Sequence, residues 1–171
     1  MLATMIWTTF DRPAGRVRVG PIDGASAIEL FDLFARVVAA GEGYPQVPPL
    51  TRDEFEATWV RPTTAVVAAW LGDELAGAYY LKPNFPGRGA HIANAGYVVD
   101  RPHRSQGIGR ILVEDSIQRA PALGFDAIQF NLVFDSNPAR RLYEDLGWRE
   151  IGRIPRAIGS EDAVIYWRAV P

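Results

Sequence analysis

The sequence predicts an α/β fold, in which strands and covering helices alternate around one mixed sheet. Three observations lead to this expectation: short apolar runs that suit strands, stretches with apolar residues at helical spacing, and a glycine-rich turn that joins a strand to a helix. The expected order is a strand, two helices, three strands, a helix, a strand, a helix and two strands. With 171 residues, the chain is most simply a single domain over residues 1–171.

The first half of the chain predicts two helices and a hairpin. Residues 1–16 show little periodicity and are expected to lead loosely into the first strand. A capping-box pattern that starts at Thr51 indicates a short helix, and Gly72-Asp73 is a strong signal for a hairpin turn. The glycine- and proline-rich residues 41–49 predict a loop. The expected elements are a strand at 17–19, helices at 25–40 and 51–59, and strands at 65–71 and 75–82.

In the second half, strands again alternate with helices. Pro121 is expected to end or bend the helix before it. The last helix is expected to have Asn137 as its N-cap, Pro138 at its first position and Gly147 just past its end. The expected elements are strands at 91–99 and 127–134, helices at 107–120 and after 137, and final strands at 148–154 and 163–169.

Composition excludes several classes of function. The 18 basic and 20 acidic residues are interspersed and give a net charge of −2, so no basic stripe indicates nucleic acid. The chain has no cysteine, and two histidines cannot build a zinc site by themselves, so no metal is expected. No apolar run approaches the length of a membrane span, and no charged leader begins the chain. We therefore expect a cytoplasmic protein without a membrane or nucleic-acid partner.

The most informative segment is Arg104-Ser105-Gln106-Gly107-Ile108-Gly109, between a strand and a helix. Glycines there let backbone N–H groups converge into an anion-binding nest at a helix N-terminus, which suits a diphosphate. No lysine follows Gly109, which excludes a P-loop, and Leu112 replaces the third glycine of a dinucleotide fingerprint. Taken alone, the segment also fits a tight turn without a ligand.

Two motifs together carry a family resemblance. Arg-x-x-Gly-x-Gly at 104–109 resembles the acetyl-CoA-binding motif of the GNAT superfamily of N-acetyltransferases. Residues 137–148 resemble its Asn-x-x-Ala-x-x-x-Tyr-x-x-x-Gly-Phe pattern, with Ala139 displaced by one position and Trp148 in place of Phe. The resemblance covers about residues 90–158. It implies a mostly antiparallel central sheet flanked by helices, in which a parallel strand pair splays apart to bind coenzyme A.

The same resemblance implies acetyl-CoA as the cofactor and suggests which residues hold it. Backbone groups of Val98 and Val99 are expected to meet the pantetheine and the thioester. The first turn of the last helix is also expected near the cofactor, although Asn137 suits a cap and arginines at such positions are commonly solvated. The expected cofactor-binding residues are Val98, Val99, Arg104, Ser105, Gln106, Gly107, Ile108, Gly109, Arg110, Asn137, Ala139 and Arg140.

Tyr143 is the candidate general acid, through its place in the second motif. A phenol with a reference pKa of about 10 stays protonated at neutral pH and can protonate a thiolate of pKa about 8.5. For an arbitrary helical tyrosine, packing against the sheet would be the simpler interpretation.

The acceptor side carries weaker signals. Asn94 and Asn131 lie in the middle of two neighbouring strands, where asparagine is disfavoured, so they either line a substrate cleft or make structural hydrogen bonds. The stretch is similar to fungal acetyltransferases of proline analogues, in which such asparagines meet the substrate. Tyr44 and Glu42 in the loop are further candidates for substrate binding. No residue stands out as the base that deprotonates the amine: Glu42 and a chain of water molecules are equally good candidates, and His91, at a strand end, is expected to be structural.

These observations predict an acetyl-CoA-dependent N-acetyltransferase that acts on a small-molecule amine such as an amino acid or an analogue. The alternatives are a protein or peptide N-acetyltransferase and a non-catalytic acyl-CoA-binding domain. Homodimers are common among proteins that resemble this one, but no feature of the sequence decides that state.

Overall fold

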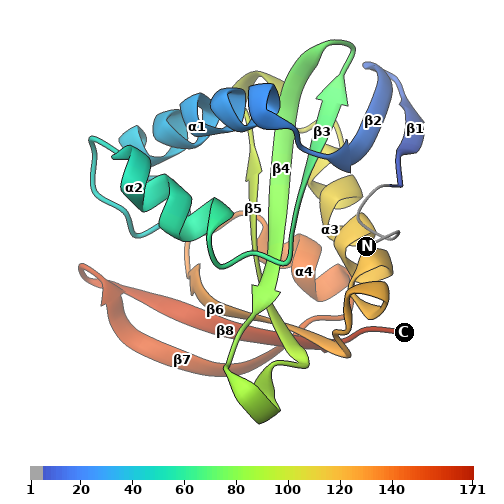
Figure 1. The fold of residues 1–171 in the computed structure, drawn as a ribbon. Helices are drawn as coiled ribbons and strands as arrows, with labels where there is room; N and C mark the ends of the chain where they lie inside the picture. Colours follow the sequence, from blue (N-terminus) through green and yellow to red (C-terminus); the bar gives the residue numbers. More distant parts are fainter. Residues whose placement is uncertain (1–5) are drawn as a thin grey trace.

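The computed structural model describes residues 6–171, whose strands form one eight-stranded sheet (Figure 1). The order across the sheet is β1-β2-β3-β4-β5-β6-β8-β7, and every neighbouring pair is antiparallel except β5 and β6. This confirms the mixed, mostly antiparallel sheet with one parallel pair. The strands are β1 Thr8–Arg12, β2 Gly15–Pro21, β3 Ala65–Leu71, β4 Glu74–Pro83, β5 Ile92–Val99, β6 Ala127–Phe134, β7 Arg149–Ile158 and β8 Glu161–Ala169.

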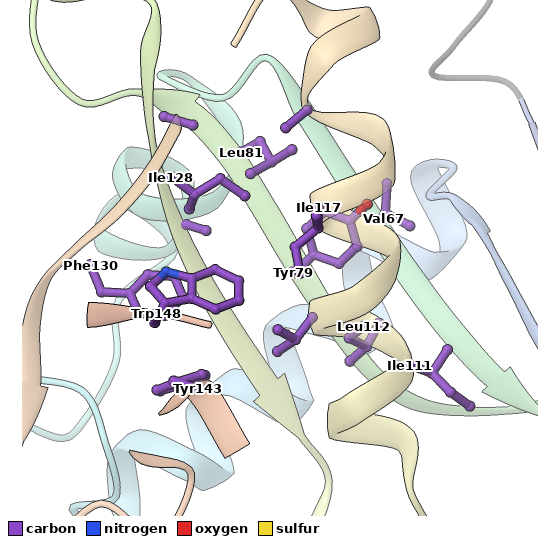
Figure 2. Packing of buried hydrophobic residues seen from close by; sticks show 14 of the residues in the cluster. Val67, Tyr79, Leu81, Ile111, Leu112, Ile117, Ile128, Phe130, Tyr143 and Trp148 are labelled. Carbon is purple, nitrogen blue, oxygen red and sulfur yellow. The ribbon is translucent and has the colours of Figure 1, made fainter. Parts of the chain in front are cut away.

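Helices cover both faces of the sheet (Figure 1). The helices are α1 Gly24–Ala39, α2 Arg52–Phe55 with a π-helical turn Glu56–Val60, α3 Ile108–Arg119 and α4 Arg140–Asp145. Helices α1 and α2 bury one core against the sheet, and α3 and α4 bury the other. Figure 2 shows the second core, in which Ile111, Leu112 and Ile117 of α3 face the sheet beside Tyr79. Among the described residues, no helix has the length and apolar character that crossing a bilayer requires.

The N-terminal segment differs from the expectation. Instead of a loose lead-in, β1 forms a hairpin with β2, in register from Thr8 opposite Val19 to Arg12 opposite Gly15. Its side chains alternate between half-buried and exposed rather than between buried and exposed, so the strand leaves little hydrophobic periodicity in the sequence. The first five residues of the predicted lead-in lie outside the described part of the chain.

Local signals set most helix ends as expected. The Thr51 side chain accepts from the Glu54 N–H while the Glu54 carboxylate accepts from the Thr51 N–H, which is the predicted capping box. Helix α4 begins at Arg140, later than predicted, because a tight turn precedes it: the Asn137 side chain accepts from the Ala139 N–H at 2.9 Å. Gly147 follows this helix with a φ of +86°, as its predicted position requires.

Candidate active site

The parallel strands β5 and β6 pair over only three residues. Their ladder runs from Ile92 opposite Ala127 to Asn94 opposite Gln129 and then ends. Beyond Asn94 the two strands separate, so the backbone of β5 has no strand partner on that side. This opening is the splay that the resemblance implied.

The direction of the β5 backbone decides which groups face the opening. The carbonyl of Ile92 bonds to the chain after β4, whereas that of His91 bonds to Asp126, next to β6. Because successive residues of a strand point their N–H and C=O groups to opposite edges, Tyr97 and Val99 face the opening. The Val98 N–H and C=O face β4, so Tyr97 rather than Val98 presents its backbone groups to the opening.

At the start of α3, the glycine-rich turn where a nest is predicted leaves its backbone N–H groups unpaired among the described residues. Ser105 and Gly107 have φ values of +61° and +81°, and Gly107 is the N-cap of α3. Within residues 6–171, the backbone N–H groups of residues 105–110 have no hydrogen-bond acceptor. Arg12, from the β1–β2 hairpin, lies beside them, since a Cβ on Gly107 would be 3.4 Å from its Nε. Unpaired backbone donors at a helix N-terminus beside a guanidinium suit an anion.

The two arginines of the turn itself are already engaged. Arg104 pairs with Glu42 at 2.6 Å, and its Nε donates to the Val99 carbonyl at 3.2 Å. Arg110 lies 3.4 Å from the Glu114 carboxylate. Arg12 has no carboxylate partner within the described part of the chain. Among the arginines at the nest, its guanidinium is therefore the one whose charge is not already paired with a carboxylate.

A cavity of about 800 Å³ passes through the opening between β5 and β6 and reaches both faces of the sheet. Gly109, Val113 and Tyr143 line it on the α3 and α4 face, whereas Tyr80 and Asn94 line it on the α1 and α2 face. The predicted site residues that line this cavity are Glu42, Tyr44, Asn94, Val98, Val99, Arg104, Gly109, Asn131, Asn137, Ala139 and Tyr143. Those that do not are Ser105, Gln106, Gly107, Ile108 and Arg110 of the turn, and Arg140.

Arg140 has structural partners. Its Nε donates to the Tyr166 hydroxyl at 3.0 Å, and its guanidinium forms an ion pair with Asp135. These contacts tie α4 to β8 and to the turn after β6, so its side chain is occupied without a ligand.

Tyr143 stands at the opening with its hydroxyl unbonded. The residue is 7% exposed, and its ring packs against Phe130 at 4.7 Å and Trp148 at 6.0 Å between ring centres (Figure 2). Within residues 6–171 the hydroxyl has no hydrogen-bond partner, although the residue lines the cavity. Burial, with a further contribution from Tyr166, raises the pKa of Tyr143, so the phenol keeps its proton at physiological pH.

Tyr44 closes the cavity from the loop between α1 and α2. Its hydroxyl donates to the Tyr97 carbonyl at 3.0 Å, and burial raises the pKa of this phenol. The contact requires glycine at position 96, because a Cβ there would lie 2.8 Å from the Tyr44 hydroxyl and 2.6 Å from the Tyr80 ring.

Glu42 is held in an ion pair by Arg104, an arginine of the glycine-rich turn. The hydrogen bond from Arg104 lowers the pKa of the Glu42 carboxyl, which favours its charged form. A carboxylate stabilised in this way is a weak base, so Glu42 is a poor candidate for deprotonating the amine.

The two strand asparagines share one face but have different surroundings. Asn94 is 9% exposed; its amide donates to the Gln129 carbonyl at 3.1 Å and accepts from the Tyr80 hydroxyl at 3.4 Å. Asn131 is exposed and donates to the Asn84 side chain at 2.6 Å. Asn94 thus bonds to β6 at the point where the strands separate, and Asn131 lines the same cavity.

Sequence reasoning missed two basic residues at the site, Lys82 of β4 and Arg12 of β1. Lys82 lines the cavity beside Asn94, its partner in the β4–β5 register. Neither residue belongs to a motif; the signal for Lys82 is that it is the only lysine among 18 basic residues.

Comparison with known proteins agrees with this geometry. Residues 11–148 match the family model described as the acetyltransferase (GNAT) family. N-acetyltransferase aca1 of Schizosaccharomyces pombe is 35% identical over 152 residues, covering 75% of this chain and 73% of that protein. A GCN5-related N-acetyltransferase from Kribbella flavida superimposes with a TM-score of 0.83 at 33% identity, over 90% of this chain and 98% of that one.

A more distant structure shares the fold. The structure of yncA from Salmonella typhimurium, determined with its cofactor acetyl-CoA, gives a TM-score of 0.78 at 16% identity, over 91% of this chain and 94% of that one. With most of the chain matched by the family model and by a relative above 30% identity, this protein belongs to the GNAT family of acetyl-CoA-dependent acetyltransferases.

Proposed function

We propose that this protein transfers the acetyl group of acetyl-CoA to the amine of a small molecule, such as an amino acid or an analogue. The observation that carries the proposal is the single cavity that joins the Tyr143 hydroxyl, the free edge of β5 and the polar face at Asn94. A volume of about 800 Å³ lies within the range of small-molecule sites. The Tyr44 loop encloses the cavity on the acceptor side, which favours a small acceptor over a protein chain.

The residues at the nest fit a coenzyme A diphosphate. Six unbonded N–H groups at residues 105–110 and the Arg12 guanidinium supply donors and positive charge. The N–H groups of Tyr97 and Val99 supply strand-like donors for the pantetheine and the thioester carbonyl. When bound, acetyl-CoA supplies the activated acetyl group.

The chain's own groups then have distinct tasks. A preorganised backbone N–H aimed at the thioester oxygen contributes about 3 kcal/mol. The Tyr143 hydroxyl holds a proton at the opening, ready for the departing sulfur. The two carboxylates that line the cavity, Glu42 and Glu161, are engaged with Arg104 and the Ser136 N–H, and neither histidine lines it, so we propose that water takes the proton of the amine.

An amine panel tests the proposal. Native protein and Tyr143→Phe are assayed with acetyl-CoA against amino acids, simple amines and peptides, while the Kd for coenzyme A is measured by calorimetry. Turnover of small amines supports the proposal. Turnover of peptides alone would replace it by a protein acetyltransferase, and coenzyme A binding without any turnover by a binding domain.

A further inference from the structure

Lys82 is a charged residue of the cavity to which the proposed function gives no role. It is the only lysine of the chain and lies on β4, directly opposite Asn94 of β5. Opposite residues of an antiparallel pair present their side chains on the same face, so Lys82 shares the acceptor face with Asn94 and Tyr80. Its ammonium lies 4.8 Å from the centre of the Tyr80 ring, and it lines the cavity.

Lys82 has no ion-pair partner. Within residues 6–171, no carboxylate lies within ion-pair distance of its ammonium. The two carboxylates that line the cavity are engaged elsewhere, Glu42 with Arg104 and Glu161 with the Ser136 N–H at 2.6 Å. Because Lys82 is half-buried, desolvation lowers the pKa of its ammonium. A partly desolvated charge without a counter-charge is unfavourable for folding unless a ligand supplies one.

The surroundings of Lys82 are rich in donors. The Lys82 ammonium has three N–H donors, and the amide of Asn94 has one hydrogen left beyond its bond to Gln129. The amide of Asn131 lies on the same face one strand further along the sheet. Such a set of donors around an unpaired cation is complementary to an anion rather than to an ammonium group.

We propose that Lys82 binds an anionic group of the acceptor, so that the substrate is an amine that also carries a carboxylate or a similar acid. This inference rests on the proposed function and assigns a specificity-determining residue to it. Lys82 and the reacting amine then occupy opposite ends of one small acceptor, with the amine at the opening near Tyr143. Amines without an acidic group lose this contact and are expected to be poor substrates.

Two other roles for Lys82 make different predictions. A lysine that only covers the Tyr80 ring would affect stability and would not distinguish charged from neutral acceptors. A lysine that acts as the base for the amine would reduce kcat for every acceptor alike. Only anion recognition makes the effect of a Lys82 substitution depend on the acid group of the substrate.

The test compares matched acceptors and matched variants. The acceptors are an amino acid, its neutral carboxamide and its decarboxylated amine, all assayed at saturating acetyl-CoA. The variants are Lys82→Met, Lys82→Arg, and Arg52→Met as a control, because Arg52 covers the Phe31 ring at 4.1 Å outside the cavity. Affinity for coenzyme A and thermal unfolding are measured for each.

Native protein is expected to prefer the amino acid over both neutral analogues. Lys82→Met should raise the KM for the amino acid by about 10- to 100-fold, the usual range for a charged hydrogen bond. It should leave the KM for the carboxamide and the Kd for coenzyme A unchanged, while Lys82→Arg restores part of the preference. Arg52→Met should change none of these kinetic constants.

Two results would overturn the inference while leaving the proposed function intact. One is a native enzyme that acetylates the carboxamide as well as the amino acid. The other is an equal loss for both acceptors in Lys82→Met. If native protein binds coenzyme A but acetylates no small amine, the proposed function itself fails, and this inference fails with it.

Discussion

Replacement of Tyr143 by phenylalanine isolates one hydroxyl at the site. Within the described residues that hydroxyl has no hydrogen-bond partner, so its removal breaks no bond. The ring keeps its contacts with Phe130 and Trp148 at 4.7 and 6.0 Å between centres. We expect the free energy of unfolding to change by less than about 1 kcal/mol. Any large effect on activity then reports chemistry rather than folding.

The expected effect on turnover is a fall in kcat of about 100-fold, at the low end for a general acid. This corresponds to about 2.7 kcal/mol of transition-state stabilisation. The raised pKa of Tyr143 keeps the phenol protonated but makes it a weaker acid, which is why the low end applies. The assay follows release of the free thiol at saturating acetyl-CoA and acceptor, with the Kd for coenzyme A measured in parallel.

Tyr166→Phe is the matched control. The Tyr166 hydroxyl belongs to the same aromatic cluster but donates to Glu144 at 2.6 Å and accepts from Arg140 at 3.0 Å. Its loss should lower stability by about 1 kcal/mol and leave kcat within about twofold. If Tyr143→Phe keeps native kcat, or loses activity only through weaker coenzyme A binding, Tyr143 is not the acid.

Four further outcomes are expected. Gly107→Val should lower the free energy of unfolding by about 1–2 kcal/mol, because the φ at this position is +81°. It should also weaken coenzyme A binding at least tenfold, because the valine side chain would block the nest. An unchanged Kd would show that the nest lies elsewhere. Arg12→Ala should weaken coenzyme A binding by up to about fivefold, because a half-buried guanidinium beside the nest is lost. Arg16→Ala, in the same hairpin but paired with Asp11, should not weaken it. Gly96→Ala should break the hydrogen bond from Tyr44 to the Tyr97 carbonyl, because the new Cβ would lie 2.8 Å from the Tyr44 hydroxyl. Amide hydrogen exchange in residues 41–46 should then become faster. Unchanged exchange would show that this hydrogen bond does not hold the loop in place. Finally, burial raises the pKa of all six tyrosines, that of Tyr80 to about 12, so folding favours the neutral phenols. The urea midpoint of unfolding should therefore stay constant up to about pH 10, where the tyrosines of the unfolded chain ionise, and should fall at higher pH. A midpoint that does not change through pH 11 would contradict this expectation.

The parts of the fold that local chemistry fixes could be predicted from the sequence. The capping box at Thr51, the hairpin at Gly72 and the glycine after α4 each depend on a few adjacent residues. Strand β1 could not be predicted, because its half-exposed side chains carry no hydrophobic alternation and its stability comes from pairing with β2. The start of α4 was displaced because Asn137 caps a tight turn rather than a regular helical turn.

The candidate site divides in the same way. The nest consists of consecutive residues, 105–110, so its glycines at a strand-to-helix turn can be recognised in the sequence without the rest of the structure. The direction of the β5 backbone groups cannot be recognised in this way, because it depends on which residues of β5 bond to β4. For that reason the expected backbone donor is Tyr97 rather than Val98. The pairing of Glu42 with Arg104 likewise joins a loop to a turn about 60 residues away along the chain.

The two faces of the sheet therefore separate the groups expected to bind the cofactor from those expected to bind the acceptor. On the face of α3 and α4, the groups expected to hold the cofactor are mostly backbone groups, which is why a sequence motif can describe them. On the face of α1 and α2, the cavity is lined by side chains from β4, β5, β6 and a distant loop, and no motif spans such a set. A substitution at Lys82 is expected to change the preferred acceptor without contacting any residue of the nest. We therefore expect acceptor specificity to vary while the nest and the β5 edge stay unchanged, because the two proposed binding surfaces share only the opening between β5 and β6.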